Sequence, residues 1–197
     1  MAATDRNIRP RALALGALAL GALALMFVTA ATVGASPAAA HPCAHAHASP
    51  KAVGTGQASH AVICLLDKRR HDHGLGSLRA NRDLRRAARE HSRQMDGHGC
   101  FEHVCPGEPG IASRLLHSGY LLKGLLSWAY GEDIAWGGAR YGTPASIVRA
   151  WMNSPPHREN ILSGRFEDVG VGVAWGTPSN GQGDGGFYTA DFGYRRR

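Results

Sequence analysis

The pattern of apolar and polar positions between residues 59 and 99 predicts two helices. From Ser59 an apolar stripe runs into a basic stretch, Lys68-Arg69-Arg70, and Gly74 ends it. Asn81 is typical of a helix N-cap. Beyond it, apolar residues at spacings of i, i+3, i+4, i+7 and i+11 predict one continuous buried face, made of Leu84, Ala87, Ala88, His91 and Met95. Gly97 and Gly99 are expected to end this second helix.

Shorter elements are predicted in the middle of the chain. A short helix is expected from Ile111 to Ser118, closed by Gly119, and a loop over 121–130 leads to a strand near Glu132–Trp136. Thr143-Pro144 predicts the start of a helix whose apolar residues point inward. Ser154-Pro155-Pro156 ends that helix, and Ser154 is expected to cap one further turn through Asn160.

The last part of the chain changes to a period of two. Val169, Val171, Val173 and Trp175 alternate with small residues, which indicates a strand. The segment 176–186 consists of turn-forming residues, and a returning strand over 187–194 would complete a hairpin. Helices first and an antiparallel pair last predict an α+β layered domain.

The N-terminal 40 residues have the features of a cleaved export signal. Three arginines precede an uncharged apolar stretch from Ala12 to Ala31, and Ala38-Ala39-Ala40 offers a signal-peptidase site. An uncleaved membrane anchor is the alternative, because the apolar stretch is long enough to span a bilayer. We expect a signal peptide over 1–40, a linker over 41–57 and one domain over 58–197, exported as a secreted monomer without a stable membrane span.

Charge and cysteine usage narrow the setting. Cleavage after residue 40 lowers the formal net charge from +7 to +5, because it removes three Arg and one Asp. A basic secreted domain can associate with anionic cell-wall polymers or lipid head groups. Arginines at 79, 82, 85, 86, 89 and 93 are typical of a solvated helix face, and no nucleic-acid partner is expected since no recognition motif accompanies them.

All four cysteines lie in the exported part, where an even count indicates two disulfides with three ways of pairing. The four residues between Cys100 and Cys105 allow a turn to join them, which leaves Cys43 for Cys64. This second pairing rests on elimination alone.

Several motifs, in order, resemble those of bacterial CAP domains, the SCP/PR-1-like family. They begin with RRHDHGLGSLRANRDLRRAAREHSRQM, which resembles the opening segment of those domains. Phe101-Glu102-His103, Gly131-Glu132-Asp133-Ile134-Ala135 and the segment Trp151–Leu162 with its His157-Arg158 follow, and Thr189-x-Asp191-Phe192-Gly193 fits a closing strand. The resemblance covers about residues 59 to 194.

This resemblance implies a three-layer α-β-α sandwich with an antiparallel sheet. It also implies a cleft formed by His103, Glu132 and His157, with Ser154 at the position where eukaryotic members carry a second Glu. Asp133 stands where the family usually has Asn. Two neutral imidazoles and one carboxylate could bind a divalent metal such as zinc, or Glu132 could orient an imidazole for acid–base chemistry.

Each of these residues also has a purely structural explanation. His103 could hold a loop beside Cys105, His157 could be the third residue of a capped helix, and Glu132 could pair with Arg158 at the surface. No Gly-x-Ser-x-Gly or His-Glu-x-x-His motif and no free thiol is present. We therefore favour a secreted binding module for a lipid, a cell-wall glycan or a protein over the alternative, a metal-assisted extracellular hydrolase.

Overall fold

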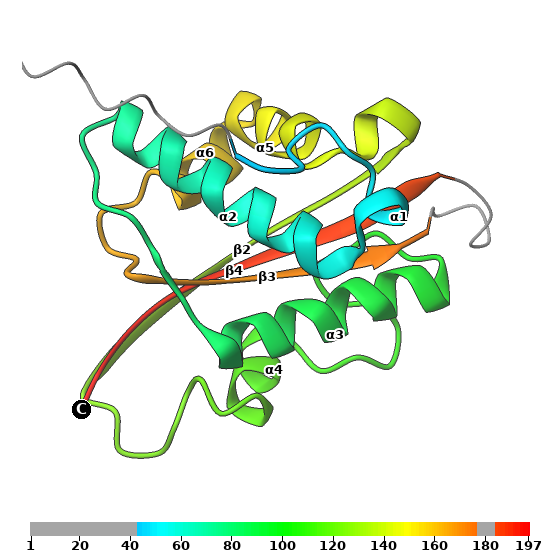
Figure 1. Ribbon diagram of the computed structural model, residues 1–197. Helices are drawn as coiled ribbons and strands as arrows, with labels where there is room; N and C mark the ends of the chain where they lie inside the picture. Colours follow the sequence, from blue (N-terminus) through cyan, green and yellow to red (C-terminus); the bar gives the residue numbers. More distant parts are fainter. Residues whose placement is uncertain (1–42, 177–183) are drawn as a thin grey trace, which may run out of the picture. The chain divides into compact units, whose positions relative to one another are not determined.

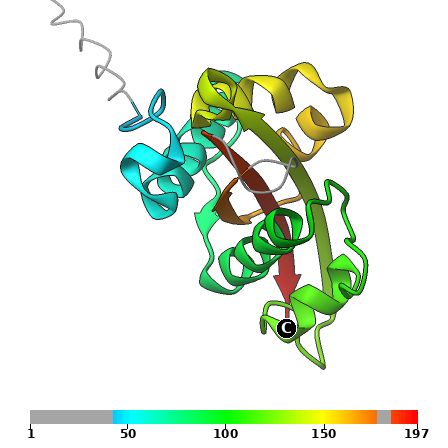
Figure 2. The same cartoon turned by 90° about the vertical axis from the view of Figure 1, so that its right-hand side faces the viewer.

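The computed structural model describes residues 43–176 and 184–197, which form helices on both faces of a four-stranded sheet (Figure 1). The predicted signal peptide, and part of the glycine-rich loop between the last two strands, lie outside the described residues. Helices α2, α5 and α6 cover one face of the sheet, and α3 and α4 cover the other (Figures 1 and 2). The expected three-layer α-β-α sandwich is confirmed.

The sheet combines one short parallel pairing with antiparallel pairings. Its strands are β1 (Arg79–Ala80), β2 (Ser127–Gly138), β3 (Asp168–Trp175) and β4 (Gly185–Arg196), in the order β1-β3-β4-β2. The predicted β3–β4 hairpin is present and antiparallel. β1 was not anticipated, because two exposed residues carry no alternation, and β2 extends beyond the predicted 132–136 at both ends. β2 forms one edge of the sheet. Loops can therefore reach the side chains of β2 from either face of the sheet.

The helices largely follow their local signals. Their bounds are α1 (Pro50–Val53), α2 (Thr55–Asp72), α3 (Arg82–His98), α4 (Ile111–His117), α5 (Pro144–Asn153) and α6 (Pro155–Ile161). Asn81 caps α3 by accepting hydrogen bonds from the backbone N–H groups of Asp83 and Leu84, and Gly99 ends it in the left-handed conformation. Thr143 caps α5, with Pro144 at its first position. Ser154 occupies the N-cap position of α6, but its side chain makes no capping hydrogen bond, which corrects that part of the prediction.

The expected linker is folded rather than extended. Residues 50–53 and 55–57 are helical, so α2 begins at Thr55 and not at Ser59. Ala46 and Pro50 are buried, and the Cys43–Cys64 disulfide ties the segment to α2. Small residues can therefore pack here because the covalent bond holds them against the helix, a constraint that their composition does not show.

Two glycines of β3 allow α3 to lie directly on the sheet. A Cβ atom at Gly170 would come within 2.0 Å of the backbone nitrogen of Arg85, and one at Gly172 within 2.1 Å of the carbonyl carbon of Ala88. The valines that alternate with them pack in the core on the opposite face. The period of two in β3 thus reflects helices on both faces, rather than one buried and one solvated face.

Candidate functional site

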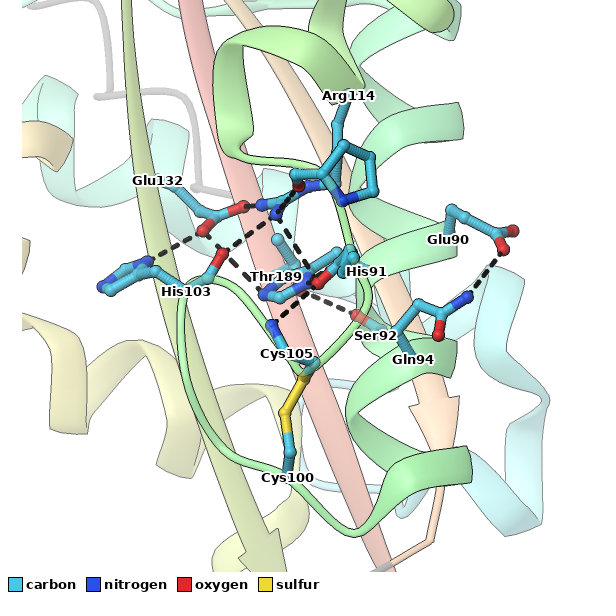
Figure 3. Close-up of polar contacts among 12 residues, drawn as sticks. Glu90, His91, Ser92, Gln94, Cys100, His103, Cys105, Arg114, Glu132 and Thr189 are labelled. Atoms are coloured by element: carbon cyan, nitrogen blue, oxygen red, sulfur yellow. Dashed lines mark hydrogen bonds and ion pairs between the residues drawn. A yellow bond between two sulfur atoms is a disulfide. The ribbon is translucent and has the colours of Figure 1, made fainter.

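The candidate site begins with the loop that follows α3. The Cys100–Cys105 disulfide, with Cα atoms 6.0 Å apart, closes this loop, as predicted. His103 lies between the two cysteines, and its side chain is half exposed. Its Nδ1 lies 2.8 Å from Oε1 of Glu132 on β2 (Figure 3). The structure therefore brings together two of the three residues that the family resemblance placed in a cleft.

Glu132 is fully buried and paired on both oxygens. While Oε1 accepts from His103, Oε2 accepts from the guanidinium of Arg114 on α4 (Figure 3). The suggested surface pair with Arg158 is therefore wrong. The side chain of Glu132 lies on the α3–α4 side of the sheet, where a buried carboxylate requires buried partners.

Arg114 connects this carboxylate to the loop. One of its terminal nitrogens donates to the carbonyl oxygen of His103 at 2.9 Å and to that of Pro109 at 3.3 Å. The same nitrogen lies 3.6 Å from the carboxylate of Glu108. A single buried guanidinium thus fixes both the backbone of His103 and the carboxylate that its imidazole contacts.

A second imidazole–carboxylate pair lies behind the first. His91 of α3 is fully buried, and its Nδ1 lies 2.8 and 2.9 Å from the two oxygens of Glu108 (Figure 3). Glu108 also accepts a hydrogen bond from the backbone N–H of Cys105. Nε2 of His91 lies 3.9 Å from Oε1 of Glu132. The helix, the disulfide loop and β2 therefore meet in one polar cluster: His91, His103, Glu108, Arg114 and Glu132.

Two further buried carboxyl groups border this cluster. Asp191 of β4 pairs in register with Glu132, is 1% exposed, and has no hydrogen-bond partner on either oxygen among the described residues. Asp133, the next residue on β2, points to the opposite face, where its Oδ1 accepts from Asn160 of α6 at 2.8 Å. Its Oδ2 is buried without a partner in the described part of the chain.

His157 approaches from this second face. It is the third residue of α6, as predicted, and is partly buried. Arg70 of α2 holds the end of that helix by donating to the carbonyl oxygens of Ile161 and Ser163 at 2.9 Å. Burial lowers the pKa of His157, and the charge of the nearby His103 lowers it further. The structure therefore links the two imidazoles through an electrostatic effect of His103 on His157, and not through a hydrogen bond among the described residues.

The surroundings of the ionisable groups shift their pKa values in different directions. The hydrogen bond to Glu132 raises the pKa of His103 against the opposing effect of burial. Burial would raise the pKa of Glu132, but the hydrogen bond from His103 and the charges of Arg114 and His91 outweigh it and lower the pKa. Burial raises the pKa of Asp133 to about 8, and burial together with the charge of Glu132 raises the pKa of Asp191. Glu132 is thus the carboxyl group whose pKa is lowered, whereas the pKa of both aspartates is raised and Asp133 is mostly protonated at pH 7.

The residues as arranged do not fit the zinc site expected from the sequence. A zinc ion would need one oxygen of Glu132 and a nitrogen from each imidazole directed at a common point. Both oxygens are already hydrogen-bonded, one to His103 and one to Arg114. Within residues 43–176 and 184–197, no group of three or more His, Cys, Asp and Glu residues could hold a metal ion. As ligands of a zinc ion, His103, Glu132 and His157 thus stay a prediction that this arrangement of side chains does not support.

Sequence reasoning missed the partners that hold Glu132. His91 was assigned to a buried helix face, but not to the site, and neither Glu108 nor Arg114 was singled out. One signal was present: Arg114 shares the i, i+3, i+4 spacing of Ile111 and Leu115 on the inward side of α4. A charged residue in that position predicts a buried counter-charge.

Comparison with known families agrees with the fold and the motifs. The family model of CAP, the cysteine-rich secretory protein family, matches residues 65–192, well over half of the chain. This chain belongs to the CAP family. The match contains both the His103–Glu132 contact and His157, so the polar cluster lies within the family domain.

The regions that match this chain are only part of each curated relative. The uncharacterized protein YkwD of Bacillus subtilis is 34% identical over 111 residues, which are 56% of this chain and 40% of that protein. The uncharacterized membrane protein YlbC of the same organism is 28% identical over 57% of this chain and 30% of its own length. The chain thus spans less than half of the curated relatives it matches.

Solved structures share the fold. An extracellular protein containing an SCP domain from Bacillus anthracis has a TM-score of 0.58 and 24% identity, over 73% of this chain and 41% of that chain. An outer surface protein from Borrelia burgdorferi has a TM-score of 0.56 and 18% identity, over 68% of this chain and 90% of that chain.

No helix in the described part of the CAP domain combines the length and the apolar character needed to cross a bilayer.

Proposed function

We propose that this CAP domain is a secreted binding module, which presents the cleft of His103, Glu132 and His157 to a lipid, glycan or protein ligand at the bacterial cell surface. The observation that carries this proposal is the double pairing of Glu132. Because His103 and Arg114 occupy its two oxygens, Glu132 holds an imidazole in place and is not free to act as a base or nucleophile.

The geometry favours one atom of the proposed cleft for contact with a ligand. With Nδ1 of His103 directed at Glu132, only Nε2 of the half-exposed ring remains for a hydrogen bond to a ligand. The raised pKa of His103 favours the protonated ring, which donates from Nε2. A ligand oxygen, such as a carbonyl, hydroxyl or phosphoryl oxygen, is the matching acceptor.

Three features support a secreted protein. Both disulfides require an oxidising compartment, and two structural relatives are an extracellular protein and an outer surface protein. The predicted signal peptide over 1–40 would provide the route.

Binding assays with three histidine variants test the proposal. Purified residues 41–197 would be titrated with peptidoglycan fragments, with phospholipid vesicles and with cell-wall glycans, and compared with His103→Ala, His157→Ala and the control His60→Ala. We expect one of these probes to bind, with an affinity at least about tenfold lower in the two cleft variants, because a hydrogen bond to a charged group contributes about 1.5–3 kcal/mol. The control, in an exposed His of α2, should bind like the wild type.

Two outcomes would contradict this proposal. Binding that neither cleft variant weakens would remove the cleft as the binding site. Stoichiometric zinc in the purified protein, lost in both cleft variants together with hydrolysis of a cell-wall polymer, would favour the metal-assisted hydrolase instead.

A further inference from the structure

The outward face of α3 consists of arginine. Arg82, Arg85, Arg86, Arg89 and Arg93 are all exposed. At about 100° per residue they fall within an arc of about 100° on the helix surface. The buried residues of α3, including Leu84, His91 and Met95, lie on the opposite side against the sheet.

This concentration of one charge is unfavourable for the helix by itself. Arginines separated by three or four residues repel each other, at about 0.2–0.5 kcal/mol per pair. Among the described residues only Asp83 forms ion pairs with them, at 2.9 Å from Arg86 and 3.7 Å from Arg82, while Arg85, Arg89 and Arg93 form no ion pair there. The sequence predicted a solvated helix face here, but a surface that is only solvated usually intersperses charges of both signs, and among the described residues this face is paired with an opposite charge only at Asp83. Contacts within the chain offset this like-charge repulsion only in part. An unfavourable local arrangement of this kind indicates a functional surface.

The same arginines line concave surfaces. Arg82, Arg85, Arg86 and Arg89 surround a hollow of about 230 Å³. Arg85 and Arg89 also line a second hollow of about 200 Å³, whose other wall includes Thr55 and Ser59 of α2. In Figure 1, α3 lies below the sheet, and its five arginines are exposed from the first turn to beyond the middle of the helix.

We propose that the arginine face of α3, defined by its five arginines, binds a linear phosphate-bearing polymer of the cell envelope. Guanidinium groups bind phosphate through two parallel hydrogen bonds. From Arg82 to Arg93 the helix rises about 16 Å along its axis, which suits a chain with repeated phosphates better than a single ion.

A bilayer surface fits this face less well. Helices that dock on membranes expose an apolar face beside their basic residues. The apolar face of α3 is buried against the sheet, and the exposed large apolar side chains, such as Leu126 and Trp128, lie on other parts of the chain. A flexible polymer can enter the two hollows, whereas a flat surface cannot.

The test compares two double variants with the same loss of charge. Purified residues 41–197 would be titrated with poly(glycerol phosphate) chains over a series of salt concentrations, using the wild type, R85Q/R89Q and the control R149Q/R165Q. Arg149 and Arg165 are exposed on α5 and on the loop after α6. We expect the affinity of R85Q/R89Q to fall and its slope of log affinity against log salt to decrease by about two, since each lost phosphate contact lowers it by about one.

The outcomes distinguish binding at the arginine face of α3 from an effect of net charge, from binding in the cleft and from binding to a membrane. Equal losses in R85Q/R89Q and R149Q/R165Q would reduce the effect to net charge and overturn the proposal. Anionic phospholipid vesicles that bind as strongly as the polymer, with the same loss in R85Q/R89Q, would also overturn it in favour of a bilayer. A loss of polymer binding in His103→Ala but not in R85Q/R89Q would place the polymer in the cleft and overturn this proposal, so the two proposals can fail independently. R85Q/R89Q should unfold at the same temperature as the wild type or higher, because it removes like-charge repulsion.

Discussion

Asp133 and Glu132 are neighbours on β2, but their environments favour different protonation states. Glu132 has the guanidinium of Arg114 and the imidazole of His103 within hydrogen-bonding distance, while Asp133 has only the neutral amide of Asn160. The hydrogen bond from Asn160 and the charge of His103 offset burial only in part, so Asp133 keeps its proton up to a pKa of about 8. A neutral Asp has nearly the shape of the Asn usual in this family, so the departure noted in the motif preserves a neutral side chain at this position.

Asp133→Asn should therefore fold normally and change the pH dependence of stability. The raised pKa means that the folded state binds a proton which the unfolded state releases near pH 3.9, so Asp133 lowers the free energy of unfolding by up to about 1.4 kcal/mol per pH unit between there and pH 8. Asp133→Asn should lack this loss and gain stability relative to the wild type as pH rises. Urea unfolding from pH 5 to 8 measures it, with the exposed Asp72→Asn as control. Parallel curves for wild type and Asp133→Asn would contradict the neutral carboxyl.

At the scale of elements, the approach of α3 to β3 determines where His91 lies. Gly170 and Gly172 leave no side chain between the strand and the helix backbone. This contact sets the position of α3 on the sheet, and His91 of α3 contacts Glu108 and lies near Glu132, so a packing feature of β3 supports the polar cluster.

Gly172→Ala should destabilise the domain by about 1–3 kcal/mol or more, as overpacked positions do. Its Cβ would lie 2.1 Å from backbone atoms of Ala88, so the helix as a whole would have to move. Gly164→Ala is the matched control, because its Cβ would come no nearer than 3.9 Å to any neighbour. Thermal unfolding of both variants would check this. If Gly172→Ala proved as stable as Gly164→Ala, the close contact between α3 and β3 would be refuted.

At the scale of the whole molecule, the two disulfides act on different parts of the chain. Cys43–Cys64 closes a loop of 21 residues and holds the N-terminal segment on α2, while Cys100–Cys105 spans five residues beside His103. The first therefore restricts the unfolded chain more, and the second restricts the loop that carries the site.

Replacing each pair by serine should separate these roles. In the chain-entropy model the loss of Cys43–Cys64 costs about 3 kcal/mol of stability and that of Cys100–Cys105 about 2 kcal/mol. Only C100S/C105S should also shift the NMR titration of His103 towards that of a free imidazole, because the loop no longer holds the ring against Glu132. Equal titration of His103 in both double variants would show that Arg114 alone positions the loop.

Local signals determined most of the secondary structure and much of the site. Caps, proline positions and periodicity predicted α3, α5 and the β3–β4 hairpin, and cysteine spacing predicted the Cys100–Cys105 disulfide, since all of these depend on residues close in sequence. The motifs also brought His103 and Glu132 together as candidates. That His157 shares a ligand with them remains a prediction.

The tertiary structure alone decided which groups are charged and what holds them. Burial and pairing depend on residues far apart in the chain: Arg114 meets Glu132 across 18 positions, and Asp191 faces Glu132 from another strand. Contacts between residues far apart in the chain also explain why the segment before α2 is folded and why β3 needs glycine. Periodicity shows that a position is buried, but only the packed structure shows which side chain lies opposite it.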